Sequence, residues 1–130
     1  MTDAAPGLTV THRRYVSHHD AHYGGSLLDG AYVMGLFGDV ATEMCLRTDG
    51  DEGLLAGYSS VAFRGPVKAG DVVEVTATLT RVGTRSRTLD LRAWVCCRSA
   101  PEVSDSAGTV LDPPLLVVEA VAEVVVPPAR

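Results

Sequence analysis

The sequence predicts an α+β fold in which one antiparallel sheet curls around a single long helix. Apolar residues recur at helical spacing between Ala31 and Met44, whereas apolar and polar residues alternate in several later segments. A series of strands with one apolar face needs a cover, and a long apolar helix that precedes them can supply it. The chain has 130 residues, an ordinary length for one domain, so we expect a single domain over residues 1–130.

The N-terminal part of the chain leads into the helix. Alternating apolar residues predict a first strand over Leu8–Val16, and a polar, glycine-containing loop follows over Ser17–Leu28. Asp29 is a suitable N-cap for a helix that we expect to end near Arg47. Gly35 inside this helix, together with Gly38, indicates close packing by a neighbour, so we expect the helix to be covered on most sides.

The rest of the chain predicts four strands joined by hairpins. Their expected ranges are Leu54–Val67, which is broken by Gly65–Pro66, and then Val72–Val82, Thr88–Arg98 and Leu115–Val126. The segment Ser99–Pro114 is rich in Ser, Pro, Asp and Gly, which predicts a long hairpin loop.

Composition excludes several classes of function. The net charge of −5 gives no overall basic field for nucleic acid. Cys45, Cys96 and Cys97 have neither metal-ligand spacing nor an even count, so we expect reduced thiols and no metal site. No apolar stretch approaches the ~18 residues of a membrane span, and the N-terminus has no signal-peptide pattern, so we expect a cytoplasmic protein.

Two parts of the sequence resemble a known family. The segment Val61–Val75 (VAFRGPVKAGDVVEV), followed by Arg81–Arg87 (RVGTRSR), resembles a strand pair of hotdog-fold thioesterases. The segment Ser17–Glu43, with Gly50–Leu54, resembles more specifically the hotdog-fold 3-aminobutyryl-CoA ammonia-lyases. The similarity extends from about Ser17 to Arg98, and the run Asp-Ala-His-Tyr-Gly-Gly is its most specific part.

This resemblance implies a function as well as a fold. It implies an acyl-CoA or acyl-carrier-protein thioester as substrate, no cofactor beyond the coenzyme A of the substrate, and reversible loss of ammonia from a 3-aminoacyl thioester. It also implies a homodimer whose sheets join and whose active sites lie at the interface. The alternative assembly is a hexamer, formed as a trimer of such dimers. The alternatives are a thioesterase, an enzyme that adds an amine to an enoyl thioester in biosynthesis, and a non-enzymatic acyl-CoA-sensing module.

The loop before the helix carries the first candidate site residues. Asp20, His22 and Tyr23 lie within four positions of one another, and a histidine that titrates near neutrality can exchange protons at working pH. Backbone N–H groups at a helix start can stabilise an enolate. Three glycines there would let the backbone approach a thioester, although a tight turn alone would also explain them: Gly24, Gly25 and Gly30.

The helix carries further candidates. Asp39 and Glu43 are four residues apart and share a face with Tyr32, either as site residues or as a solvated acidic stripe. The resemblance to thioesterases implies a catalytic acid about seven residues after a Gly-Gly pair. Counting from Gly25 that position is Tyr32, and counting from Gly30 it is Phe37, neither of which is acidic. This departure argues against simple hydrolysis. A carboxylate at Asp39 could still occupy the equivalent space after a shift of register.

Basic residues at the strand ends are the candidates for binding the phosphates of coenzyme A, although exposed cations often have no specific partner. They are Arg64, Lys68, Arg85 and Arg87.

Overall fold

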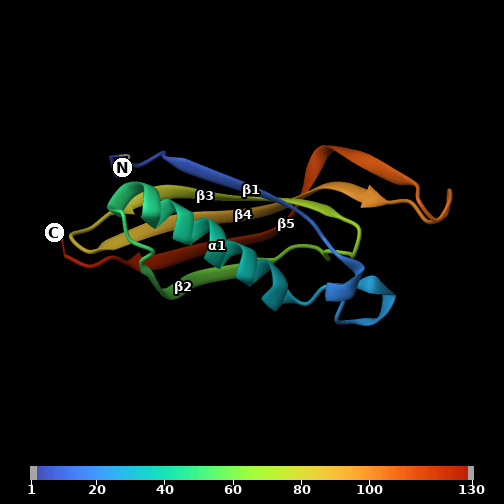
Figure 1. The fold of residues 1–130 in the computed structure, drawn as a ribbon, viewed down its shortest axis with the longest axis horizontal. Helices are drawn as coiled ribbons and strands as arrows, with labels where there is room; N and C mark the ends of the chain where they lie inside the picture. Colours follow the sequence, from blue (N-terminus) through green and yellow to red (C-terminus); the bar gives the residue numbers. More distant parts are fainter. Residues whose placement is uncertain (1–2, 129–130) are drawn as a thin grey trace.

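The computed structural model describes residues 3–128, in which one long helix lies across one antiparallel sheet (Figure 1). In chain order the elements are β1 Thr9–Tyr15, the 3₁₀ turns η1 His18–Asp20 and η2 Gly24–Ser26, α1 Gly30–Asp49, β2 Leu54–Phe63, β3 Val72–Val82, β4 Ser86–Ser99 and β5 Gly108–Val125. The α+β prediction is confirmed, and each predicted strand has an observed counterpart.

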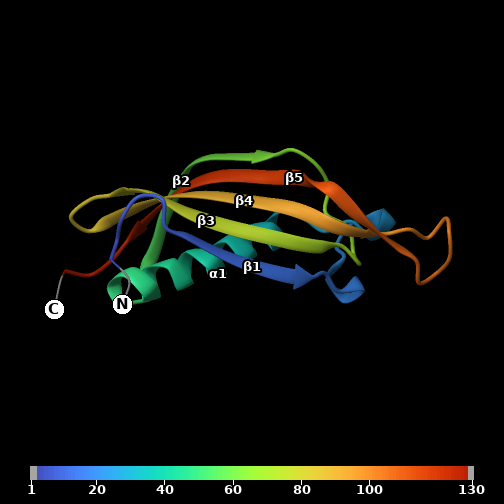
Figure 2. The same ribbon diagram turned by 90° about the horizontal axis from the view of Figure 1, so that it is seen from above.

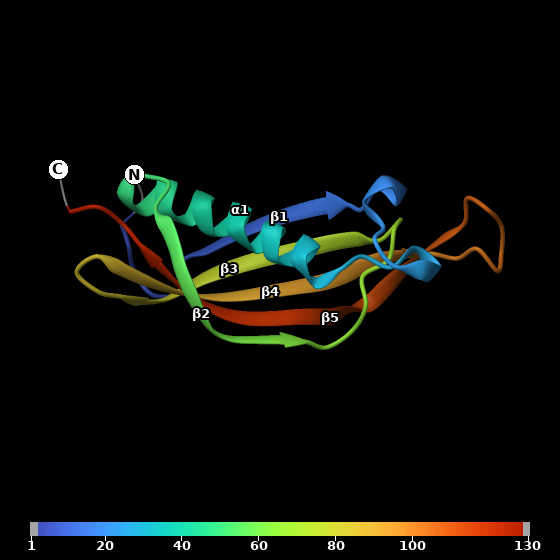
Figure 3. The ribbon, with the colours of Figure 1, turned by 90° about the horizontal axis from the view of Figure 1, so that it is seen from below.

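The order of the strands differs from the predicted series of hairpins. The sheet runs β1-β3-β4-β5-β2, so β2 pairs with β5 at one edge rather than with β3 (Figures 2 and 3). Pairing of β2 with β5 ends at Phe63, two residues before the break predicted at Gly65–Pro66, and no strand resumes up to Val67. Residues 64–71 instead carry the chain from β2 past the start of α1 to β3, and this crossing segment shapes the site described below.

The helix begins and ends at residues that suit helix termini. The Asp29 side chain accepts a hydrogen bond from the Tyr32 N–H (3.0 Å), which confirms the predicted N-cap. Gly50 caps the end of the helix with a positive φ of 65°, so the helix ends at Asp49, two residues later than expected. Phe37 and Met44 are fully buried against the sheet, where Leu79 and other apolar side chains of β3, β4 and β5 meet them.

The outer face of the helix is open within one protomer. Gly35 is exposed, and no atom lies within 4 Å of the position that a Cβ would take at Gly35 or Gly38. The prediction that these glycines accommodate a close neighbour is therefore wrong for the single chain. The helix packs on the sheet through one face, because its buried residues form a stripe rather than a full circumference.

The predicted loop Ser99–Pro114 is mostly an extension of β4 and β5. Cys97 to Ser99 pair with Val110 to Gly108, so only residues 100–107 form the turn of a projecting hairpin (Figure 1). The register shift sets one residue of β4, Cys96, against four residues of β5, so residues 111–114 lie outside the ladder with β4. Prolines are tolerated there because no backbone N–H is needed for pairing.

The cysteines behave as reduced apolar residues. Cys45 and Cys96 are buried, Cys97 is half-buried, and all three are free thiols. Burial raises the pKa of Cys45 to about 11 and also raises that of Cys96. Buried thiols with raised pKa values are unreactive.

Candidate functional site

A pocket of about 420 Å³ opens at the start of α1, and we call it the helix-start pocket. It is lined by residues 28–30 and 33 at the beginning of the helix, by residues 63–67 at the end of β2 and the start of the crossing segment, and by Val118 of β5. Most of this lining is apolar or glycine. A small apolar pocket beside free helix N–H groups suits a short acyl chain whose carbonyl needs hydrogen-bond donors.

Backbone hydrogen bonds fix the walls of this pocket. Leu28 N–H donates to the Val67 carbonyl (2.9 Å), and Ala69 N–H donates to the Ser26 carbonyl (2.8 Å). These bonds tie the loop before the helix to the crossing segment. The two segments are therefore held side by side at the mouth of the pocket.

A buried ion pair holds the crossing segment from behind. Asp71 is fully buried, and both of its carboxylate oxygens accept from the Arg98 guanidinium (3.0 and 2.9 Å). Asp71 also accepts from the Lys68 N–H, while Arg98 donates to the Pro66 carbonyl (2.9 Å). The bidentate geometry gives the pair rigidity, so the pocket wall at Pro66 is pre-formed.

A glycine stands at the first residue of the helix, where a side chain would meet an aromatic ring. A Cβ at Gly30 would lie 2.9 Å from two ring atoms of Phe63, and both residues line the helix-start pocket. A side chain at this position would therefore require the Phe63 ring to shift, and the predicted approach of the Gly30 backbone to a thioester stays a prediction. Phe63 is 58% exposed, so its ring forms part of the accessible wall.

Two ionisable side chains line the pocket, Asp29 and Arg64. Arg64 was predicted, and its Nε donates to Glu119 (2.9 Å), which leaves the rest of an exposed guanidinium at the pocket rim. Asp29 was predicted only as a helix cap. Sequence analysis missed it as a site residue because the wall that faces it comes from a distant part of the chain.

The loop candidates Asp20, His22 and Tyr23 are exposed and do not line this pocket within one protomer. The His22 and Tyr23 rings meet edge to face at 5.0 Å, and both backbone N–H groups donate to the Leu27 carbonyl (3.0 Å). Gly24 and Gly25 lie in the turn between Tyr23 and Leu27, where Gly25 has a φ of 69°. Lys68 is exposed opposite Leu27, with which it forms an isolated bridge.

Tyr32 has a buried hydroxyl for which the described residues offer no hydrogen-bond partner. Burial raises its pKa, and the nearby charges of Arg14 and Asp20 act in opposite directions on it. The predicted substrate-binding residue thus lies close to Asp20, on the side of the helix that faces β1.

The predicted acidic pair on the helix lies away from the helix-start pocket. Asp39 is exposed and borders a second cavity of about 260 Å³ between α1 and β1, together with His12 and Arg14. Glu43 accepts from Arg47 and contacts His12, each at 2.8 Å, and these hydrogen bonds lower its pKa. The expectation that a covered helix buries these carboxylates is wrong, because this face of α1 is open to solvent.

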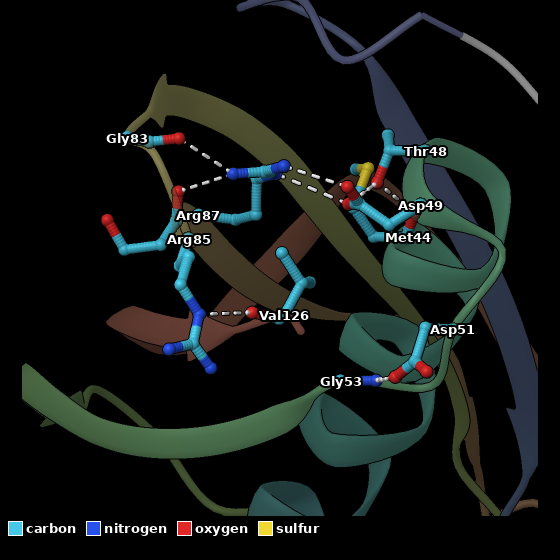
Figure 4. A network of polar contacts seen from close by, with 10 residues as sticks. Met44, Thr48, Asp49, Asp51, Gly53, Gly83, Arg85, Arg87 and Val126 are labelled. Atoms are coloured by element: carbon cyan, nitrogen blue, oxygen red, sulfur yellow. Dashed lines mark hydrogen bonds and ion pairs between the residues drawn. The ribbon is translucent and has the colours of Figure 1, made fainter. Parts of the chain in front are cut away.

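Arg85 and Arg87 lie at the opposite end of the helix (Figure 4). Arg87 is buried, and its guanidinium donates to both Asp49 oxygens (3.2 and 2.8 Å) and to the carbonyls of Gly83 and Ser86 (2.9 Å each). Asp49 lies 20 residues beyond Asp29, about 30 Å along the helix. A buried guanidinium with four hydrogen bonds is not free to bind a phosphate, which argues against Arg87 as a ligand of the coenzyme A phosphates.

The described part of the chain has neither a cluster of metal ligands nor a helix that could span a membrane. Residues 3–128 contain no group of three or more His, Cys, Asp or Glu side chains arranged to hold a metal ion. Over the same residues, no helix is long and apolar enough to cross a membrane.

The fold is one antiparallel sheet wrapped around a single long helix, with a small, mostly apolar pocket at the start of that helix. Residues 25–95 match the model of the thioesterase superfamily, so the chain belongs to that superfamily, the hotdog fold. It is 46% identical over 112 residues to 3-aminobutyryl-CoA ammonia lyase of Acetoanaerobium sticklandii, covering 86% of this chain and 89% of that protein.

Solved structures agree with this placement. β-Alanyl-CoA:ammonia lyase from Clostridium propionicum matches with a TM-score of 0.89 and 33% identity, over 94% of this chain and 87% of that one. A hexameric thioesterase from Yersinia pestis matches with a TM-score of 0.71 and 16% identity, over 98% and 90% of the two chains. The first match supports membership of the ammonia-lyase family, and the second shows the shared fold.

Proposed function

We propose that this chain is a lyase that releases ammonia from a short 3-aminoacyl-CoA, in a reversible reaction that gives the 2-enoyl-CoA. The observation that carries the proposal is the helix-start pocket, a small apolar space with a carboxylate, a cation at the rim and the first N–H groups of α1. The sequence identity to two ammonia lyases, 46% and 33%, supports this chemistry. The α-proton of a thioester is acidic enough for removal by a side chain, so we propose that no cofactor is needed.

The thioesterase remains the second candidate because the whole superfamily handles acyl thioesters. One observation favours the lyase over it. Tyr32 stands where the resemblance to thioesterases implies an acid, and its hydroxyl is buried away from solvent. Burial raises the pKa of this tyrosine, so its hydroxyl stays protonated near neutrality. It therefore cannot take the place of the ionised carboxylate that would act as the base in hydrolysis.

We assign substrate-binding roles by position. The N–H groups of the first helical turn, beginning with Gly30, lack intrahelical acceptors and would hold the thioester carbonyl. Gly24, Gly25 and Tyr23 form the adjacent turn and would border the pantetheine arm. Arg64 and Lys68, both exposed on the crossing segment, would contact the coenzyme A phosphates.

We further propose that the enzyme is a homodimer that joins two copies of β2. The two edges of the sheet differ in charge: β1 carries His12, Arg13 and Arg14, whereas β2 (LLAGYSSVAF) has no charged residue. Charged edges resist pairing with another strand, and an uncharged edge permits it. Leu54 and Phe63 at the two ends of β2 are also 74% and 58% exposed, which would leave apolar surface uncovered in a monomer.

Twofold pairing of β2 would complete the site with a residue from the partner. Antiparallel pairing sets the Leu54 end of one strand beside the Phe63 end of the other. Arg85 borders the same surface hollow as Leu54. Arg85 would therefore approach the helix-start pocket of the partner subunit, which keeps it as a candidate ligand for coenzyme A. Assembly of three dimers into a hexamer remains part of this proposal, as does a cytoplasmic location, which the three free thiols favour.

Incubation of the purified protein with crotonyl-CoA and ammonia tests the reaction. Mass spectrometry should detect 3-aminobutyryl-CoA, formed faster than free coenzyme A is released. If release of coenzyme A dominates with every thioester supplied, the thioesterase replaces the lyase. Replacing ammonia with larger amines in the same assay would detect the biosynthetic alternative.

A charge at the centre of β2 tests the assembly. Ser59 is exposed near the midpoint of the strand, so Ser59→Lys would place two like charges together near the twofold axis. Sedimentation should shift toward a 13.7 kDa species, whereas Thr11→Lys on the exposed outer side of β1 should leave the assembly intact. Wild-type protein that sediments only at 13.7 kDa at micromolar concentration would refute the dimer.

A further inference from the structure

The cap of α1 has a property that capping alone does not require. Asp29 Oδ1 accepts the Tyr32 N–H at 3.0 Å, which satisfies one free N–H of the helix. A carboxylate has two oxygens with about four acceptor sites. Within the described part of the chain, the second oxygen of Asp29 forms no hydrogen bond or ion pair. The residue also lines the helix-start pocket.

The surroundings leave Asp29 as the one carboxylate of this pocket within the described residues. The other ionisable group in the lining is Arg64, a permanent cation that cannot accept a proton. Asp39 and Glu43 lie on the face of α1 toward β1, and Asp20 and His22 are exposed on the loop. A base for chemistry inside this pocket must therefore come from Asp29 or from another subunit.

We propose that Asp29 is the catalytic base of the lyase reaction, held in place by its capping hydrogen bond. This inference rests on the function proposed above. The free oxygen of Asp29 takes the proton from C2 of the 3-ammonioacyl thioester. The electron pair of the C2–H bond becomes the C2=C3 double bond, and the C3–N bond breaks with its electrons on nitrogen, which leaves as ammonia. The protonated Asp29 then gives its proton to ammonia, and ammonium departs.

The geometry explains why a cap is a good position for such a base. The carboxylate is anchored to a rigid helix at the point where the free N–H groups of the first turn would hold the carbonyl of the same thioester. The C2 carbon is bonded to that carbonyl carbon, so the base and the donors must lie close together in space. Asp29 and Gly30 meet this requirement because they are adjacent in the chain.

Substitutions that keep the cap but remove the carboxylate test the proposal. Asn and Ser cap helices about as well as Asp, whereas Ala does not. Asp29→Asn and Asp29→Ser should therefore keep the wild-type melting temperature but lower kcat for amination of crotonyl-CoA by about 10²–10⁴-fold. Asp29→Ala should lose the same activity and also melt at a lower temperature. The affinity for crotonyl-CoA, measured by calorimetry, should change little, since this ligand has no amine and loses no proton on binding.

The controls separate failure of this inference from failure of the proposed function. Asp105→Asn, in the turn of the projecting hairpin, should retain full activity. If the wild-type protein aminates crotonyl-CoA and Asp29→Asn retains a kcat within about threefold of it, Asp29 is only a cap and the inference is wrong. If His22→Ala loses activity while Asp29→Ser keeps it, His22 is the base instead. If the wild type itself has no lyase activity on any thioester, both the proposed function and the inference fall.

Discussion

Substitution of Arg87 by alanine tests the polar network at the far end of the helix (Figure 4). Arg87 and Asp49 have side chains that are 8% and 19% exposed, and they share two hydrogen bonds. The guanidinium also binds the carbonyls of Gly83 and Ser86 in the β3–β4 hairpin. The pair therefore ties the last turn of α1 to two strands.

The expected cost follows from the burial of the pair. Removing one partner of a buried ion pair costs about 3–5 kcal/mol, because the other charge stays buried without compensation. For 130 residues the unfolding entropy is about 0.27 kcal/mol/K, so the melting temperature should fall by about 10–20 °C. Thermal unfolding followed by circular dichroism, at one fixed protein concentration, measures this shift.

A second variant shows whether the loss arises from the unpaired charge. Replacing both members by apolar residues, as in Arg87→Met with Asp49→Leu, should recover much of the stability, because no buried charge then remains. If the free energy of unfolding of Arg87→Ala falls by less than about 1 kcal/mol, the reasoning is refuted, since that value is typical of exposed ion pairs. The KM for a CoA thioester should stay near the wild-type value in the cold, where the variant is folded. A large rise in KM would restore Arg87 as a ligand of coenzyme A.

Three further predictions concern the pocket and the charged groups. Gly30→Ala should displace the Phe63 ring and lower kcat/KM for crotonyl-CoA, and adding Phe63→Ala should recover part of the loss because the contact at 2.9 Å is then removed. Burial opposes ionisation of Asp49, but hydrogen bonds from Arg87 and Thr48 outweigh it and lower its pKa. The free energy of unfolding that ionised Asp49 contributes should therefore be complete above the ordinary aspartate pKa of about 4, and it should be lost as the pH falls through the lower pKa of the folded state. Urea titrations at several pH values measure this loss. The loss should be smaller in Arg87→Ala, because the hydrogen bonds from Arg87 are then absent. Dialysis against EDTA should leave the lyase rate unchanged, and recovery of a lost rate by a divalent ion would reveal a metal site.

The helix and most strands could be predicted because their signals are local. The spacing of Phe37, Val40 and Met44 defines the buried stripe of α1, and the alternation in β3 defines its inner face. Asp29 and Gly50 set the ends of the helix through chemistry that involves only their neighbours in the chain.

The pairing of β2 could not be predicted from the same signals. Consecutive strands pair or neighbour each other in about two-thirds of cases, so a hairpin between β2 and β3 was the reasonable expectation. Alternation of apolar residues tells which face of a strand is buried, but it does not identify the neighbouring strand. The same limit applies to His12, whose contact with Glu43 joins residues 31 positions apart that no local pattern connects.

The candidate site shows how this limit affects the prediction of function. An aspartate before an apolar helix is explained by capping, so the sequence offers no reason to give Asp29 a second role. That reason arises because β2 lies beside β5 and the chain must return to β3 past the start of α1. The return path places Phe63, Arg64 and Pro66 across from the cap and encloses the carboxylate in a pocket. The features that distinguish a base from a cap are the free oxygen and the enclosed space beside it, and the crossing segment creates that space more than 30 residues after Asp29 in the chain.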